Sequence, residues 1–211
     1  MPAVTLKQKA YDRLKQLLLN GEINSNEQLT EKYLTEKLGM SRTPIRAALE
    51  RLTVERLLNY SSNKGISLVE LSLMEVLDFY DFRKSIEGYI VKKISLIEWE
   101  ESDLLWFRDN LAKQEEYMRS RDYAAFTLLD SAFHRKLAEV YGNQEMIQAM
   151  DQLQDKLYQV ALKVLRKDKT RIQISYEDHV ALFDAIVDGK TAEAEQLIYD
   201  HLEIGARILM N

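Results

Sequence analysis

Hydrophobic positions in the first third of the chain recur at helical spacing in three short segments. The first has its apolar face over Tyr11–Leu18, the second runs over Leu29–Leu38, and the third opens at Ser41. Asn20-Gly21 and Gly39 follow the first two segments, and both are helix stop signals. The spacing therefore predicts three helices, the last two separated by a tight turn.

The third predicted helix has a distinct apolar face. Its apolar residues fall at i, i+3, i+4 and i+7 and are Ile45, Ala48, Leu49 and Leu52. Pro44 is tolerated because it lies in the first turn. If this face is buried, Thr43 and Arg46 point outward, with Arg42 at the edge.

Two short strands are predicted after the third helix. Leu57–Tyr60 and Ile66–Val69 flank the turn-forming residues 61–65, a pattern typical of a hairpin. Three helices followed by a hairpin is the order of a winged helix-turn-helix, whose recognition helix enters the major groove of DNA. We expect this domain to span residues 1–71.

From Ser72 onward the pattern is helical, without proline and with few glycines. We expect about six helices, near 73–97, 101–119, 121–141, 143–166, 173–188 and 191–209. The predicted fold is mainly α: a winged helix-turn-helix of three helices and a two-stranded wing, followed by an all-α bundle over 72–211.

Composition restricts the class of protein. The 211 residues include 7 Gly, 2 Pro and no Cys, which fits a helical chain and excludes disulfides and thiolate zinc sites. No stretch approaches the roughly 18 apolar residues of a membrane span, and the N-terminus lacks the apolar core of a signal peptide. We expect a soluble cytoplasmic protein without a membrane partner.

The charge is uneven along the chain. Residues 1–70 contain 11 Lys and Arg against 8 Asp and Glu, whereas the remainder contains 18 against 26. A basic first part is compatible with the neutralisation of DNA phosphates, although small domains also differ in charge by chance.

Candidate DNA contacts gather at the start of the third helix, in the run from Ser41 to Arg46. Arginine matches the O6/N7 edge of guanine, and a helix N-terminus attracts phosphate. Lys32 on the preceding helix and Lys64 in the wing are candidate contacts to the DNA backbone. For any single arginine, an ordinary solvated charge is the favoured interpretation. The order of the helices, the turn, the outward arginines and the following wing together favour DNA contacts.

The run Leu38-Gly39-Met40-Ser41-Arg42-Thr43-Pro44-Ile45-Arg46 and the Ala48–Leu52 segment resemble the recognition segment of the GntR family of bacterial regulators. The resemblance implies that Arg42, Thr43 and Arg46 contact bases or adjoining phosphates and that Lys32 binds phosphate. It also implies that Gly65 of the wing lies at the minor groove.

All three histidines lie in the second part of the chain, at positions where a hydrophobic residue is expected. His134 follows Asp130 by four residues on one helix, and His179 and His201 lie on the last two. Burying such groups without partners costs roughly several kcal/mol. They are therefore expected to bind each other, water or an ion. Three imidazoles and a carboxylate suit Zn, Ni, Fe or Mn; hydrogen-bonded core histidines are the alternative.

The second part is similar to the FCD ligand-binding domain of the FadR subfamily, in its shorter, VanR-like form. Metal-binding members of that subfamily place an Asp, a His four residues later and two more His on the last two long helices. The resemblance therefore implies that Asp130, His134, His179 and His201 hold a divalent transition metal.

Arg83 lies in a segment that matches an RxxxE pattern of the same family. It is a candidate anchor for an acidic effector. An ion pair with Glu87, one helical turn later, is the alternative.

These features predict a homodimeric transcription regulator, acting as a repressor on a pseudo-palindromic DNA operator and controlled by a small organic acid bound at or near a metal. A metal-dependent enzyme is the alternative from another class, but the sequence contains no HExxH motif and no evident nucleophile or base. A regulator with a purely structural metal is the third reading.

Overall fold

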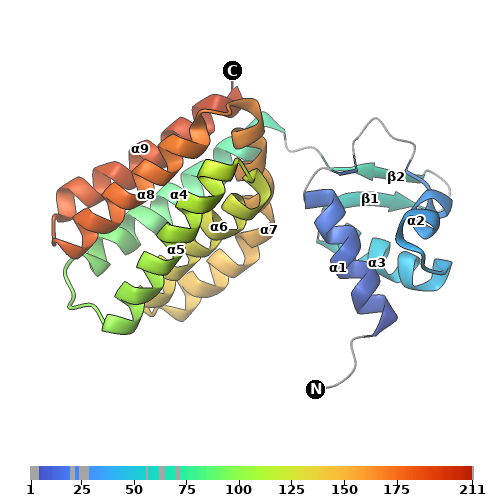
Figure 1. Cartoon of the computed structure of the whole chain (residues 1–211), viewed down its shortest axis with the longest axis horizontal. Helices are drawn as coiled ribbons and strands as arrows, with labels where there is room; N and C mark the ends of the chain where they lie inside the picture. Colours follow the sequence, from blue (N-terminus) through green and yellow to red (C-terminus); the bar gives the residue numbers. More distant parts are fainter. Residues whose placement is uncertain are drawn as a thin grey trace. The chain divides into compact units, whose positions relative to one another are not determined.

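The computed structural model describes residues 5–19, 22–23, 29–55, 57–61, 65–69 and 72–210. The chain divides into two compact units, Met1–Leu71 and Ser72–Asn211. The described residues form nine helices and one two-stranded antiparallel sheet (Figure 1). This confirms the predicted fold class.

The first unit consists of three helices and a hairpin. Its elements are α1 (Leu6–Leu19), α2 (Glu31–Leu38), α3 (Arg42–Val54), β1 (Leu58–Ser61) and β2 (Gly65–Leu68). Helix α3 packs against α1, α2 and β1, and this packing buries almost all of its predicted apolar face. Gly39 ends α2 with a φ of 62°, a left-handed conformation that glycine adopts without strain. The turn between α2 and α3 is therefore short.

The second unit is a bundle of helices (Figure 1). Its elements are α4 (Leu73–Ile94), α5 (Glu101–Ser120), α6 (Tyr123–Tyr141), α7 (Gln144–Lys167), α8 (Arg171–Val187) and α9 (Thr191–Met210). Helix α4 packs against α6 and α9, and α8 packs against α5 and α9. The helices α4, α6, α8 and α9 therefore surround a shared interior.

Helices α4 and α9 approach each other closely at two glycines. A Cβ at Gly88 of α4 would lie 2.5 Å from the hydroxyl of Tyr199, and one at Gly205 of α9 would lie 2.5 Å from the hydroxyl of Tyr80. Each glycine thus leaves room for a tyrosine of the opposite helix.

Several ends differ from the predicted boundaries by one to three residues. Helix α8 begins at Arg171, because the side chain of Asp168 accepts hydrogen bonds from the backbone N–H and the hydroxyl of Thr170 and turns the chain into the helix early. Helix α4 ends at Ile94, and both strands shift by one residue.

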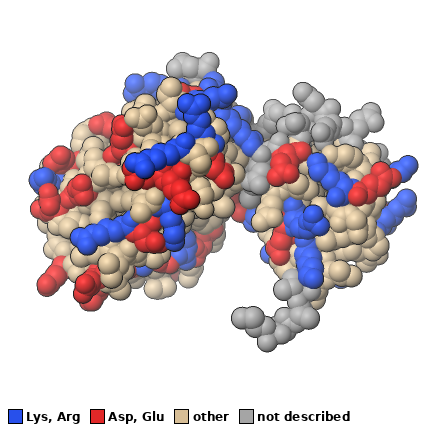
Figure 2. All heavy atoms as spheres, viewed as in Figure 1, with Lys and Arg blue, Asp and Glu red and all other residues tan. Residues whose placement is uncertain are grey.

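None of the described helices combines the length and the apolar character needed to cross a membrane. On the face of the second unit that Figure 2 shows, acidic and basic side chains are interspersed.

Candidate nucleic-acid interface and metal centre

The N-terminal end of α3 presents polar side chains to solvent. Ser41, Arg42, Thr43 and Arg46 are exposed, whereas Pro44 and Ile45 between them are buried. The helix begins after Ser41, whose side chain makes no capping hydrogen bond within the described residues. The outward orientation agrees with the one that the hydrophobic spacing predicts.

Arg46 is oriented by a carboxylate from α2. Its Nε lies 3.0 Å from both oxygens of Glu31, and the hydroxyl of Tyr60 in β1 donates to the same carboxylate. The hydrogen bond from Tyr60, followed by the contact with Arg46, holds the pKa of Glu31 below its ordinary value. Glu31 therefore stays charged and connects the recognition helix to the wing.

A shallow groove brings together most of the predicted DNA contacts. Lys32, Arg42, Arg46 and Gly65 line it, together with Glu31 and Tyr60. Lys64 lies outside the described residues.

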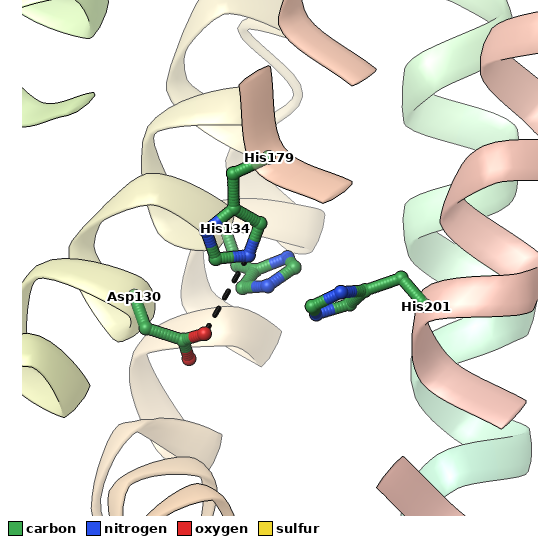
Figure 3. A group of neighbouring side chains, drawn as sticks. All are labelled: Asp130, His134, His179 and His201. Carbon is green, nitrogen blue, oxygen red and sulfur yellow. Dashed lines mark ion pairs between the residues drawn. The ribbon is translucent and has the colours of Figure 1, made fainter. Parts of the chain in front are cut away.

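The second unit brings the four predicted metal ligands together. Asp130 and His134 come from α6, His179 from α8 and His201 from α9, and all four are buried. One ligand atom from each residue lies within 4.8 Å of the others. The side chains point toward a common centre (Figure 3).

Each histidine is oriented through its Nδ1. His134 Nδ1 lies 2.6 Å from Glu87 Oε2, His179 Nδ1 lies 2.8 Å from Gln114 Oε1, and His201 Nδ1 lies 3.0 Å from Asp178 Oδ2. The contact between His134 and Glu87 has the distance of an ion pair but not the direction of a hydrogen bond. Such outer partners leave Nε2 as the metal-binding atom.

Two of the three inner nitrogen atoms have no hydrogen-bond partner in the described part of the chain. Among the described residues, Nε2 of His134 and Nε2 of His179 are buried without a hydrogen bond, and the latter lies 3.5 Å from Asp130 Oδ1. Burial lowers the pKa of His179 well below its ordinary value and lowers that of His201 to about 4. A transition metal requires a carboxylate and imidazoles with an unprotonated nitrogen. Burial favours the neutral form of His179 and His201, and Asp130 supplies the carboxylate, so the residues fit such an ion.

Arg83 forms the ion pair that the sequence offered as the alternative to effector binding. Its Nε lies 2.5 Å from Glu87 Oε1 and its Nη2 lies 3.3 Å from Oε2, with both side chains buried. Burial by itself raises the pKa of Glu87, but the charges of Arg83 and His134 lower it to about 2. The carboxylate of Glu87 thus joins Arg83 to the metal centre.

A small cavity lies beside the candidate metal centre. Its polar wall consists of Tyr80, Arg83, Asp130, Arg171, Ser175 and His201. Its apolar wall consists of Ala161, Val164, Leu165, Leu202 and Gly205. Arg83, the predicted effector anchor, therefore lies at the edge of the same space as two of the metal ligands.

Sequence reasoning missed the residues that support these sites. Glu31, Gln114 and Arg171 lie far along the chain from the groups that they contact, and no spacing pattern connects them. Asp178 precedes His179 in sequence but contacts His201 on another helix.

Family comparisons match both units. Residues 6–68 match the family described as bacterial regulatory proteins, gntR family, and residues 78–204 match the FCD domain.

Curated relatives match along most of their length. The chain is 27% identical over 199 residues to the HTH-type transcriptional repressor GlaR of Escherichia coli (strain K12), covering 91% of this chain and 90% of that protein. It is 27% identical over 179 residues to the Nta operon transcriptional regulator of Aminobacter aminovorans, covering 84% and 81%. It is 23% identical to the gluconate operon transcriptional repressor of Bacillus licheniformis, covering 81% and 68%.

Solved structures share the fold. E. coli McbR/YncC superposes with a TM-score of 0.77 at 19% identity, over 99% of this chain and 98% of that one. Lar, which controls the expression of the Listeria monocytogenes agr system, superposes with a TM-score of 0.65 at 19% identity, over the same shares.

Proposed function

The chain belongs to the GntR family of bacterial regulatory proteins, with an FCD domain as its second unit, and from this premise we propose that it is a repressor controlled by a small anionic effector. Like its relatives, it is a transcriptional regulator and not an enzyme. We infer that it acts in the cytoplasm as a homodimer on a pseudo-palindromic operator, because two recognition helices related by a two-fold axis read two half-sites. Two relatives are named as repressors, which supports repression rather than activation.

The observation that carries DNA binding is the exposed end of α3. Arg42, Thr43 and Arg46 point outward beside Lys32 and the wing glycine Gly65. In this proposal the arginines and Thr43 reach bases or adjoining phosphates, Ser41 and Lys32 bind the DNA backbone, and Gly65 approaches the minor groove. Lys64 of the wing is included as a further phosphate contact.

Selection from a random pool of duplex DNA tests the proposal. We expect the full-length protein to enrich a two-fold symmetric sequence. Arg46→Ala should weaken binding to the enriched site by roughly 5- to 150-fold, since a bidentate arginine–guanine contact discriminates by about 1–3 kcal/mol. Arg119→Ala, an exposed change on α5 with the same loss of charge, should bind normally. No enrichment of any sequence, with or without metal, contradicts the proposal.

The second unit is proposed to hold a divalent transition metal, one of Zn, Ni, Fe or Mn, through Asp130, His134, His179 and His201. The unpartnered Nε2 atoms of His134 and His179 support this ligand set. When bound, such an ion is a Lewis acid with room for further oxygen ligands. Elemental analysis of the purified wild type against His179→Ala tests the set; equal metal content with unchanged helical circular dichroism contradicts it.

The effector is proposed to be a small organic acid that binds in the cavity beside this centre. The cavity supports this because cationic side chains, Arg83 among them, line its polar wall. Calorimetric titration of metal-loaded protein with small carboxylates separates this proposal from a purely structural metal. Heat of binding supports a sensing role, and its absence across a broad panel supports a structural one.

A further inference from the structure

We propose that Arg171 is the group that binds the carboxylate of the effector and that the effector is a singly charged anion. The inference rests on the proposed function, since it assumes that the second unit senses a ligand beside a bound metal. It adds the residue that recognises the ligand and the charge that the ligand carries.

Arg171 is a buried cation with an unused donor. It is the first residue of α8 and is 2% exposed. Its Nη2 donates to Asp178 Oδ2 at 2.8 Å and to the backbone oxygen of His201 at 3.3 Å, and it lies 3.0 Å from His201 Nδ1. Its Nη1 is buried and, within the described part of the chain, has no hydrogen-bond partner. A buried unpaired N–H of a charged group is costly, and an oxygen bound in the adjoining cavity would remove that cost.

Arg83 borders the same cavity, but Glu87 already engages two of its nitrogen atoms. Glu87 accepts hydrogen bonds from its Nε and from its Nη2, and the same carboxylate contacts His134. If Arg83 turned toward a ligand, it would leave Glu87 without its buried countercharge, which is strongly destabilising. The geometry therefore favours Arg171 over Arg83 as the anchor.

The charges around the cavity favour a ligand with one negative charge. The guanidinium groups of Arg83 and Arg171 are buried. Three carboxylates face them: Glu87 and Asp130 are buried and Asp178 is partly exposed, so one negative charge is in excess. This excess favours a cation, and a divalent ion changes it to one positive charge in excess. A monoanion then brings the cluster to neutrality, whereas a dianion leaves an uncompensated charge that is costly to bury.

The shape of the cavity is consistent with a compact monocarboxylate. Its volume of about 30 Å³ favours a small ligand over a bulky one. The lining also includes Ala161, Val164 and Leu165 of α7, which suit a short apolar tail. We assign the site to a short-chain monocarboxylate.

Calorimetric titration of the metal-loaded, full-length protein tests the assignment, with acetate and propionate as probes. Propionamide is the uncharged control, and succinate is the dianionic one. We expect the monocarboxylates to bind and both controls to bind at least 10-fold more weakly. Arg171→Gln should weaken propionate binding by about 10- to 100-fold, since a hydrogen bond to a charged group is worth about 1.5–3 kcal/mol. Lys169→Gln removes the same charge from an exposed position nearby and should leave propionate binding unchanged.

Metal content, measured on every sample, distinguishes the possible failures. Normal propionate binding by metal-loaded Arg171→Gln overturns the assignment and leaves the proposed function intact. Absence of carboxylate binding to metal-loaded wild type overturns both the assignment and the sensing role. If Arg171→Gln loses its metal, Arg171→Lys serves as the second variant, because it retains the charge but not the paired donors. Weakened propionate binding by a metal-loaded Arg171→Lys supports the assignment, and loss of metal from both variants overturns it in favour of a structural role for Arg171.

Discussion

The three histidines of the candidate metal centre contact chemically different groups through Nδ1. Glu87 and Asp178 are carboxylates, whereas Gln114, which contacts His179, is a neutral amide. Gln114 is fully buried and is itself held by a hydrogen bond to Asn110. The orientation of His179 thus depends on a fixed amide within the bundle.

Replacement of Gln114 by Met should weaken metal binding by about 10- to 100-fold, because His179 loses the acceptor that fixes its ring. Methionine has a similar volume, so the fold should persist. Competition with a chromophoric chelator measures the dissociation constant of the metal. Gln196→Met, an exposed change on α9, is the control; equal affinity of both variants would mean that Gln114 does not support the site.

At the surface of the first unit, Glu31 is an acidic group among basic ones. It contacts Arg46 and Tyr60 and lies in the groove that Lys32 and Arg42 also line. A carboxylate at this position repels DNA phosphates while it orients an arginine. It therefore favours specific binding at the expense of overall affinity.

The Glu31→Gln variant should bind scrambled duplex DNA more tightly and discriminate the selected site less well. We expect the dissociation constant for scrambled DNA divided by that for the selected site to fall roughly fivefold. This corresponds to about 1 kcal/mol, the energy of one charge facing a phosphate in water. Fluorescence anisotropy at fixed salt measures both constants. Glu36→Gln changes the same charge on the exposed face of α2 and should preserve the ratio. An unchanged ratio for Glu31→Gln contradicts the positioning role.

The exposed and buried positions of α3 follow from the sequence, whereas their polar partners do not. Helical periodicity alone turns Ile45 inward and Arg46 outward. The contact of Arg46 with Glu31 depends on how α2 and α3 pack, which single-sequence patterns do not encode. In the same way, histidines at apolar positions indicate a polar cluster, but the residues behind them become visible only in the folded bundle.

Among the elements, α4 and α9 depend most on small residues. Gly205 faces the hydroxyl of Tyr80, which is 4% exposed and surrounded by the bundle, and Gly88 faces Tyr199, which is partly exposed. A methyl group at either glycine requires the opposing ring to move. Only the ring of Tyr199 has solvent into which it can move.

Gly205→Ala should therefore lower the free energy of unfolding by about 1–2 kcal/mol, even after the gain in helix propensity. Gly88→Ala should have a smaller effect, since Tyr199 yields. Urea denaturation of metal-loaded protein, followed by circular dichroism, compares the two variants. Greater destabilisation by Gly88→Ala than by Gly205→Ala would contradict the prediction that the buried ring of Tyr80 yields less than that of Tyr199.

Element positions were more predictable than element ends. The hydrophobic spacing locates all six helices of the second unit, because long amphipathic segments average over many residues. The start of α8 depends on a single side chain, Asp168, and lies two residues before the predicted residue 173. This difference placed Arg171 outside the predicted helix.

For the whole molecule, the division into two units predicts two responses to metal. The four proposed ligands all lie in Ser72–Asn211, so metal should stabilise only that unit. At a free metal concentration of about 100 times the dissociation constant, the gain is about 2.7 kcal/mol, or roughly 10 °C in the midpoint of that unit.

Differential scanning calorimetry with and without chelator measures this effect. One transition should move and the transition of the first unit should stay. His179→Ala should remove the shift. A common shift of both transitions would mean that the units unfold together.

Helix α8 carries residues of two roles at consecutive positions. Asp178 supports His201, and His179 faces Asp130 and Gln114. Neighbouring residues on a helix point about 100° apart, so both contacts exist at only one rotational setting of α8. Insertion of one alanine within α8 before Asp178 should therefore abolish metal binding. The same insertion in the short loop that follows Asp188 leaves this register intact, so it should cost far less metal affinity than an insertion within α8.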